Sequence, residues 1–172
     1  MLAETLNQAL TALQEQQTGQ LKIFNVNVEK ESLSAEIAYA FEDGMPTFTH
    51  RGWNAEGEKS EYQYQDGKLI IPEGDLPETT IENTTQYRTL SEIAGVDIMP
   101  IQQGEIQTMD CQLLQDGTQV YTVEMKQSDV REEEPYASVW APKYRRYVVK
   151  EGRLAELEVG DSQTYTMKIQ FL

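Results

Sequence analysis

The stretch GQLKIFNVNVEKES, residues 19–32, decides the predicted fold, because GEIQTMDCQLLQDG, residues 104–117, matches it at a constant offset of 85 residues. The same offset aligns YQYQDGKL, residues 62–69, with YVVKEGRL, residues 147–154. In both blocks apolar residues meet apolar residues and turn residues meet turn residues. Similarity at one fixed period is typical of a duplicated unit, here of about 86 residues. The alternative is two unrelated sets of similar hairpins.

An amphipathic helix is predicted ahead of the first block. Leu6, Leu10 and Leu13 recur at a spacing of three to four among polar residues, which indicates a helix over residues 2–17. Gly19 follows directly, as glycine often does just past a helix end. The apolar face of this helix is expected to cover one side of the following sheet.

The first block itself predicts a hairpin with one apolar face. Apolar and polar residues alternate through it, as in a half-buried strand. A two-residue turn at Glu31 and Ser32 would place Phe24, Val26 and Val28 together on the covered face. The opposite face would then be polar and exposed to water.

Both halves of the chain are expected to share this plan. Residues 66–67 (Asp-Gly) and 151–152 (Glu-Gly) predict tight hairpin turns. Thr89 and Glu92 form a capping box, which predicts a short second helix. The predicted fold is α+β: a tandem repeat of one helix packed on a four-stranded antiparallel meander, with an extra C-terminal strand. The first repeat would span residues 1–85, with an acidic linker at residues 72–85, and the second would span residues 86–172.

The charge of the chain bears on its partners. It has 29 acidic and 14 basic residues, for a formal net charge of −15. Such a field repels nucleic acids and anionic membranes and attracts basic proteins. The sequence therefore predicts a protein partner with a basic surface, and neither direct nucleic-acid binding nor membrane binding.

The predicted location is the cytoplasm. The chain begins without a basic segment followed by an apolar one, and no apolar run approaches the roughly 20 residues that span a bilayer. Cys111 is the single cysteine and forms no internal disulfide, as in a reducing compartment. A mature exported chain whose signal had been replaced by Met1 would look the same.

Catalytic equipment is sparse in this sequence. His50 and Cys111 are the single histidine and the single cysteine, which is too few for a zinc site built from such ligands. No phosphate-binding loop, nucleophile elbow or dinucleotide fingerprint occurs. Cys111 is interpreted as a small buried hydrophobic residue on the apolar face of a strand, the alternative being a catalytic dyad with His50. We expect no enzyme activity, no cofactor and no metal.

A cluster of aromatic and basic residues near the C-terminal third departs from the acidic background. Tyrosine, tryptophan and arginine are the residues that most often dominate protein interfaces. The alternative is that two or three of these rings belong to the core and the arginines only solvate a strand edge. A smaller counterpart lies in the first half of the chain. The predicted partner-binding residues are Tyr136, Trp140, Tyr144, Arg145, Arg146, Trp53 and His50.

The predicted plan resembles, in architecture alone, proteins such as the beta-lactamase inhibitory protein, whose tandem helix-plus-sheet repeats present a concave sheet to a target enzyme. The resemblance covers the repeat plan and transfers no residue. With the charge, it implies an acidic, non-enzymatic protein-binding module of the inhibitor, immunity, anti-defence or adaptor type, which masks a basic or enzymatic surface. The alternative is a small-ligand-binding protein or enzyme with a site between helix and sheet or between the repeats.

Overall fold

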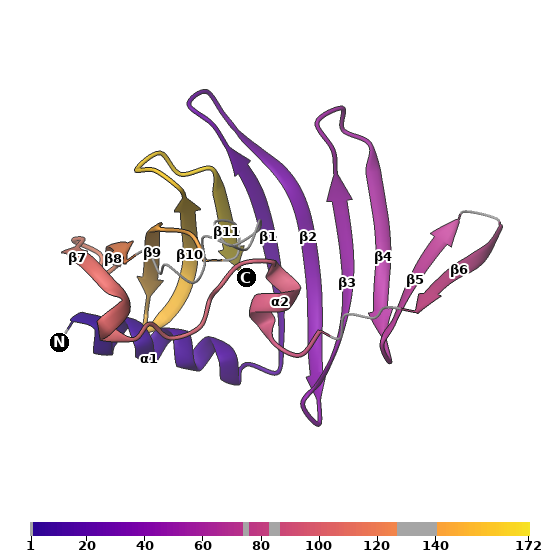
Figure 1. Ribbon diagram of the computed structural model, residues 1–172, viewed down its shortest axis with the longest axis horizontal. Helices are drawn as coiled ribbons and strands as arrows, with labels where there is room; N and C mark the ends of the chain where they lie inside the picture. The colour runs from indigo at the N-terminus through magenta and orange to yellow at the C-terminus, as the bar shows by residue number, and fades with distance from the viewer. Residues whose placement is uncertain (1, 74–75, 83–86, 127–140) are drawn as a thin grey trace.

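A computed structural model describes residues 2–73, 76–82, 87–126 and 141–172 (Figure 1). Its helical elements are α1 (Leu2–Glu15), α2 (Leu90–Ala94) and the 3-10 turn η1 (Gln103–Glu105). Its strands are β1 (Thr18–Val26), β2 (Glu31–Glu42), β3 (Met45–Trp53), β4 (Lys59–Gln65), β5 (Lys68–Glu73), β6 (Leu76–Glu82), β7 (Ile106–Leu113), β8 (Gln119–Met125), β9 (Tyr144–Lys150), β10 (Arg153–Gly160) and β11 (Met167–Phe171).

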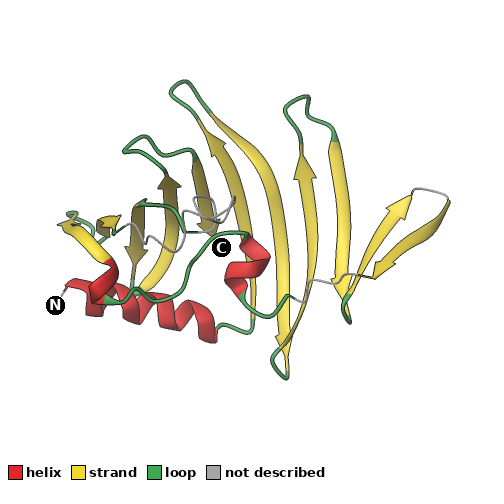
Figure 2. Cartoon of the chain, in the orientation of Figure 1, coloured by secondary structure: helices red, strands yellow, loops and turns green. Residues whose placement is uncertain are grey.

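The strands of the described residues form one antiparallel sheet in the order β6-β5-β4-β3-β2-β1-β11-β10-β9-β8-β7 (Figure 2). The last strand, β11, pairs with β1 on one side and with β10 on the other. The two halves of the chain are thus joined edge to edge through the C-terminal strand. The sheet curves, and both α-helices lie on its concave face (Figure 1).

The predicted tandem repeat is wrong, because the strands belong to a single sheet around a single core. The second pair of sequence blocks, residues 62–69 and 147–154, contains equivalent turns. Asp66 and Gly67 have φ values of 53° and 76°, and Glu151 and Gly152 have nearly the same values, 51° and 76°. These left-handed pairs fit the tight turn of a two-residue hairpin. The predicted linker at residues 72–85 contains β6, and its boundary with residue 86 lies outside the described residues.

The face of β1 also differs from the prediction. Leu21 and Ile23 pair with Ile37 and Ala35 in the core, and the register shifts after Ile23. The turn lies at residues 27–30 rather than at Glu31 and Ser32, because the Asn27 side-chain oxygen accepts hydrogen bonds of 2.9 Å from the N–H groups of Glu29 and Lys30. Val28 is consequently 93% exposed at the tip of the loop, and Phe24 and Val26 lie outside the buried core.

The first helix is confirmed as the amphipathic cover of the sheet. Leu6, Leu10 and Leu13 are buried and belong to the core cluster. Each such side chain contributes about 1.5–3 kcal/mol through its burial. The predicted cap of the second helix is also confirmed: the Glu92 N–H donates to the Thr89 hydroxyl at 3.2 Å. Two helices therefore pack on one face of a single large sheet.

Candidate functional site

The concave face of the sheet has two parts, and only the first is covered by α1. Helix α1 packs on β10 and β7, and residues 95–102, called here the crossing segment, run beside it. Val96, Ile98 and Ile101 of the crossing segment are buried in the core. This part of the concave face, the filled half, is therefore occupied by the protein's own side chains.

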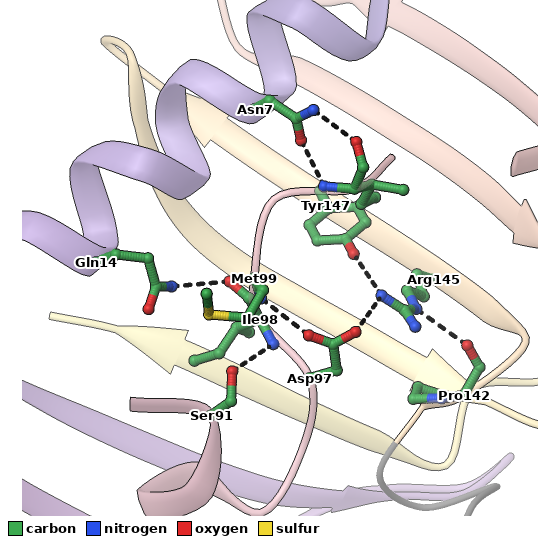
Figure 3. A network of polar contacts seen from close by, with 10 residues as sticks. Asn7, Gln14, Ser91, Asp97, Ile98, Met99, Pro142, Arg145 and Tyr147 are labelled. Carbon is green, nitrogen blue, oxygen red and sulfur yellow. Dashed lines mark hydrogen bonds and ion pairs between the residues drawn. The ribbon is translucent and has the colours of Figure 1, made fainter. Parts of the chain in front are cut away.

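Side-chain amides hold the crossing segment in place (Figure 3). Asn7 donates to the carbonyl of Ile101 and accepts from its N–H, both at 2.7 Å. Gln14 donates to the Ile98 carbonyl at 2.9 Å, and the hydroxyl of Ser91 accepts from the Ile98 N–H at 3.0 Å. The backbone of a buried, irregular segment is thus satisfied by two residues of α1 that lie two turns apart and by one residue of α2.

A buried arginine fastens the same segment to the sheet. Arg145 of β9 is 1% exposed, and its Nη1 lies 3.5 Å from Oδ2 of Asp97 and 3.3 Å from the hydroxyl of Tyr147. Its Nε donates to the carbonyl of Pro142 at 3.0 Å. Burial raises the pKa of Tyr147, so its hydroxyl stays neutral and can accept a hydrogen bond. The network gives the buried cation three partners (Figure 3).

The other part of the concave face is lined by rings, and we call it the aromatic half. Tyr39, Phe48 and Tyr64 lie side by side on β2, β3 and β4. One row along the sheet, His50 pairs with Tyr62. Alternate residues of a strand share a face, so both rows face the same way. The aromatic half consists of Tyr39, Phe41, Phe48, His50, Tyr62, Tyr64 and Tyr87.

The rings of the aromatic half contact one another directly. The centroids of Phe48 and Tyr64 are 5.2 Å apart in a stacked arrangement. Tyr87, which precedes α2, meets both of these rings edge-on at 5.1 and 5.0 Å. His50 stacks on Tyr62 at 4.7 Å, with an angle of 11° between the ring planes. Stacked and edge-on pairs at these distances are favourable geometries.

The rings of the aromatic half differ in how far they are buried. Tyr39, Phe48 and Tyr64 are buried, whereas Phe41, Tyr62, Tyr87 and Leu69 are only half-buried. An open hollow of about 400 Å³ lies on the opposite face of these strands, because most of its lining residues alternate with the rings: Ala38, Ala40, Thr47, Thr49, Gln63 and Gln65. Half-buried rings on the concave face offer apolar surface that a ligand can remove from water.

Polar groups in the aromatic half are neutral. Burial lowers the pKa of His50, which favours the uncharged imidazole, and its Nδ1 is buried without a hydrogen-bond partner. Burial, with a smaller effect from Tyr87, raises the pKa of Tyr62 to about 12. The rings of His50 and Tyr62 are therefore neutral at neutral pH, which suits an uncharged, apolar group.

The predicted partner-binding residues of β9 have different environments. Tyr144 is half-buried, with the Lys143 ammonium 5.3 Å from the centre of its ring. Arg146 forms an ion pair of 2.8 Å with Glu158 across the sheet. The burial of Arg145 makes it part of the interior rather than an exposed contact. Tyr136 and Trp140 lie outside the described residues.

The two predicted groups are not brought together. Trp53 and His50 lie on β3, whereas Tyr144 and Arg146 lie on β9, and β2, β1, β11 and β10 stand between these strands. Trp53 is half-buried at the end of β3, and His50 belongs to the aromatic half. Partner binding by Tyr144, Arg146 and Trp53 stays a prediction.

Sequence reasoning missed most of the aromatic half. The signal was present as three short alternations, Tyr39 with Phe41, Phe48 with His50, and Tyr62 with Tyr64. Rings repeated at every second residue in three successive strands line one face of a sheet. Tyr87 carried no comparable signal, because it lies between elements.

Two kinds of site receive no support within the described residues. No group of three or more histidine, cysteine, aspartate or glutamate side chains there is arranged to hold a metal ion. None of the helices in the same part of the chain is both long and apolar enough to cross a bilayer.

Comparison with solved structures supports the single-sheet architecture. The crystal structure of the Mycobacterium tuberculosis lipoprotein LppX superposes with a TM-score of 0.60 and 13% sequence identity, covering 99% of this chain and 93% of LppX. The chain shares the fold of LppX. At this identity the likeness shows the fold alone, and it supports the correction of the predicted tandem repeat.

Weaker likenesses are found in two other solved structures. The complex of Pseudomonas aeruginosa MucA and MucB gives a TM-score of 0.45 at 14% identity, covering 98% of this chain and 54% of that one. A LolA superfamily protein, NE2245 from Nitrosomonas europaea, gives 0.35 at 11% identity, covering 98% of this chain and 90% of that one. No protein-family model and no curated protein matches the sequence.

Proposed function

We propose that this protein is a non-enzymatic binding protein that holds an apolar ligand, such as the acyl chain of a lipid, on the aromatic half of its concave face. The observation that carries the proposal is a set of neighbouring rings on one face: Tyr39, Phe48 and Tyr64 are buried, and Phe41, Tyr62 and Tyr87 beside them are only half-buried. Covering the half-buried rings removes apolar surface from water, which stabilises the complex by about 25 cal/mol per Å².

The division of the concave face supports this assignment. Helix α1 and the crossing segment take up the filled half with buried aliphatic side chains. The aromatic half instead keeps several of its rings only half-buried. Ligand sites are usually concave, apolar and lined with rings.

The absence of charge in the aromatic half favours a ligand with an uncharged hydrocarbon part. His50 is neutral and the Tyr62 hydroxyl remains protonated. A charged group placed among these rings would lose hydration without gaining an ionic partner. The proposed ligand therefore lays an uncharged hydrocarbon part on the rings, and any charged head group stays in water.

Native mass spectrometry of the purified protein tests the proposal. We expect adducts whose masses match acyl lipids after gentle purification, and 1:1 binding of the neutral dye N-phenyl-1-naphthylamine after the lipids are extracted. Dye fluorescence should fall when a lipid with the same acyl chain is added back. A protein that neither carries lipid nor binds the dye would contradict the assignment.

A second function rests on the charge of the chain. A net charge of −15 favours association with a basic protein surface. Glu56 and Glu58 lie exposed in the loop after β3, so replacing both with lysine should slow association and flatten its salt dependence. Affinity capture from the native cell, at low and high salt, tests whether such a partner exists. The cytoplasmic location, like the basic protein partner, stays a prediction.

A further inference from the structure

The edge strand β7 has backbone groups without partners in the described residues. It ends the strand order and pairs there with β8 alone. Figure 1 shows it at the opposite end of the sheet from β6. An edge strand presents a row of N–H and C=O groups that another extended chain can bind. The edge of β7 is therefore an interaction surface separate from the aromatic half.

The hydrogen-bond pattern identifies the free groups. The N–H of Leu114 donates to the carbonyl of Thr118 at 2.8 Å, next to the paired residues Leu113 and Gln119. In an antiparallel pair, bonded and non-bonded positions alternate. Thr108, Asp110 and Gln112 consequently bond to β8, whereas Met109, Cys111 and Leu113 direct their N–H and C=O groups away from it.

Within the described residues, most of this edge lacks the usual protection against pairing. Natural edge strands are often blocked by proline, lysine or bulges. In β7 the register is irregular only between Ile106 and Thr108, and it then runs unbroken to Leu113. The strand contains no proline and no lysine. Leu113 and Leu114 are 69% and 40% exposed at its end, so an added strand would also cover apolar surface.

Charge determines the kind of strand that fits. Asp110 is the one charged residue of β7 and forms no ion pair within the described part of the chain. Glu105 and Asp116 flank the strand and are exposed. A second copy of this chain would bring another −15 charge to the same edge. A basic extended segment would be attracted instead.

We propose that the free edge of β7 binds a basic, extended peptide segment of a partner protein by strand addition. The peptide backbone pairs with Met109, Cys111 and Leu113, its basic side chains lie near Asp110, and an apolar side chain covers Leu113 and Leu114. Main-chain hydrogen bonds supply the affinity in this mode of recognition, and the alternating side chains supply the specificity.

Amide hydrogen exchange by NMR tests the proposal residue by residue. The probe is an octapeptide of alternating lysine and valine, and the control is the same peptide with every backbone amide N-methylated. We expect the probe to slow exchange at Met109, Cys111 and Leu113 by at least tenfold. Asp110 and Gln112 should change little, because their amides already bond to β8. The N-methylated control should leave all five amides unchanged.

Two matched variants separate strand pairing from general charge attraction. Leu113→Lys and Gln112→Lys add the same charge to neighbouring positions, but only the first removes the exposed apolar side chain. We expect Leu113→Lys to weaken binding of the probe at least threefold more than Gln112→Lys does. Dye binding by the aromatic half should be unaffected in both, so this proposal can fail while the proposed function stands.

Three results would overturn the proposal. Equal protection by the probe and its N-methylated control would mean that charge alone attracts the peptide. Absence of protection at Met109, Cys111 and Leu113 would mean that the edge does not accept a strand. Protection of these amides in the free protein that grows with protein concentration would mean that a second copy occupies the edge.

Discussion

Asn7 and Ile101 exchange two hydrogen bonds of 2.7 Å although 94 residues separate them in the chain. The amide side chain of Asn7 acts here as a strand residue would, offering one donor and one acceptor to a backbone. It fixes the crossing segment over the filled half. The aromatic half is left without such a cover from α1, and this asymmetry underlies the proposed ligand site.

Replacing Asn7 with alanine should destabilise the fold by about 2–4 kcal/mol, because the N–H and C=O of the buried Ile101 would lose their partners. The matched control is Gln8→Ala, one residue along and exposed, which should change stability by less than about 0.5 kcal/mol. Urea denaturation measures both. Equal denaturation midpoints for the two variants would show that the hydrogen bonds between Asn7 and Ile101 contribute nothing to stability.

Arg145→Met and Arg146→Met should differ strongly although the residues are neighbours. Arg145 is buried with Asp97 as its ionic partner, so its removal leaves a partly buried carboxylate unpaired and should cost about 3 kcal/mol or more. Arg146 pairs with Glu158 near the surface, and its removal should cost less than about 1 kcal/mol. Thermal unfolding of the two variants checks the difference. A larger loss from Arg146→Met would mean that Arg145 is not the residue that fastens the crossing segment.

Gly19→Ala and Gly104→Ala test the correction of the fold, because the predicted duplication makes these residues equivalent. A Cβ at Gly19 would lie 2.5 Å from the Tyr39 hydroxyl, whereas one at Gly104 meets nothing within 4 Å. Displacing the Tyr39 ring should cost about 1–3 kcal/mol, and Gly104→Ala should be neutral or slightly stabilising. Similar losses in both, measured by denaturant titration, would favour equivalent units.

His50 should make stability depend on pH in one direction. Burial lowers its pKa in the folded state, so as pH falls through about 6.5 the unfolded chain takes up a proton first. Stability is therefore lost as pH falls from about 6.5 toward the folded pKa. His50→Phe keeps a ring against Tyr62 and should remove this loss. The comparison is the denaturation midpoint of each protein at pH 7.5 and 5.5, and an unchanged pH dependence in the variant would contradict it.

Local features of the fold could be predicted from the sequence because they depend on near neighbours. The spacing of Leu6, Leu10 and Leu13 located α1, and Thr89 with Glu92 located the start of α2. The Asp-Gly and Glu-Gly pairs located two hairpin turns. In each case the residues that determine the structure lie within a few positions of one another.

The arrangement of the strands could not be predicted in the same way. Nothing in the sequence of β11 states that Ile169 pairs with Ile23 on one side and Leu157 on the other. The register of β1 was missed because the side chain of Asn27 moved the turn away from Glu31. The interior position of Arg145 depends on Asp97, which another segment supplies. The ligand-binding alternative placed a site between helix and sheet, but no pattern distinguished its residues.

Titration of the lipid-free protein with N-phenyl-1-naphthylamine tests the proposed ligand site most directly, using Tyr62→Ser and Tyr144→Ser as a matched pair. Both tyrosines are half-buried, but only Tyr62 belongs to the aromatic half. Losing the Tyr62 ring should weaken dye binding about tenfold, which corresponds to about 1.4 kcal/mol of binding free energy. The Tyr144→Ser variant should bind the dye as tightly as the parent does. Equal affinity in all three proteins, or a loss confined to Tyr144→Ser, would contradict a ligand site on the aromatic half.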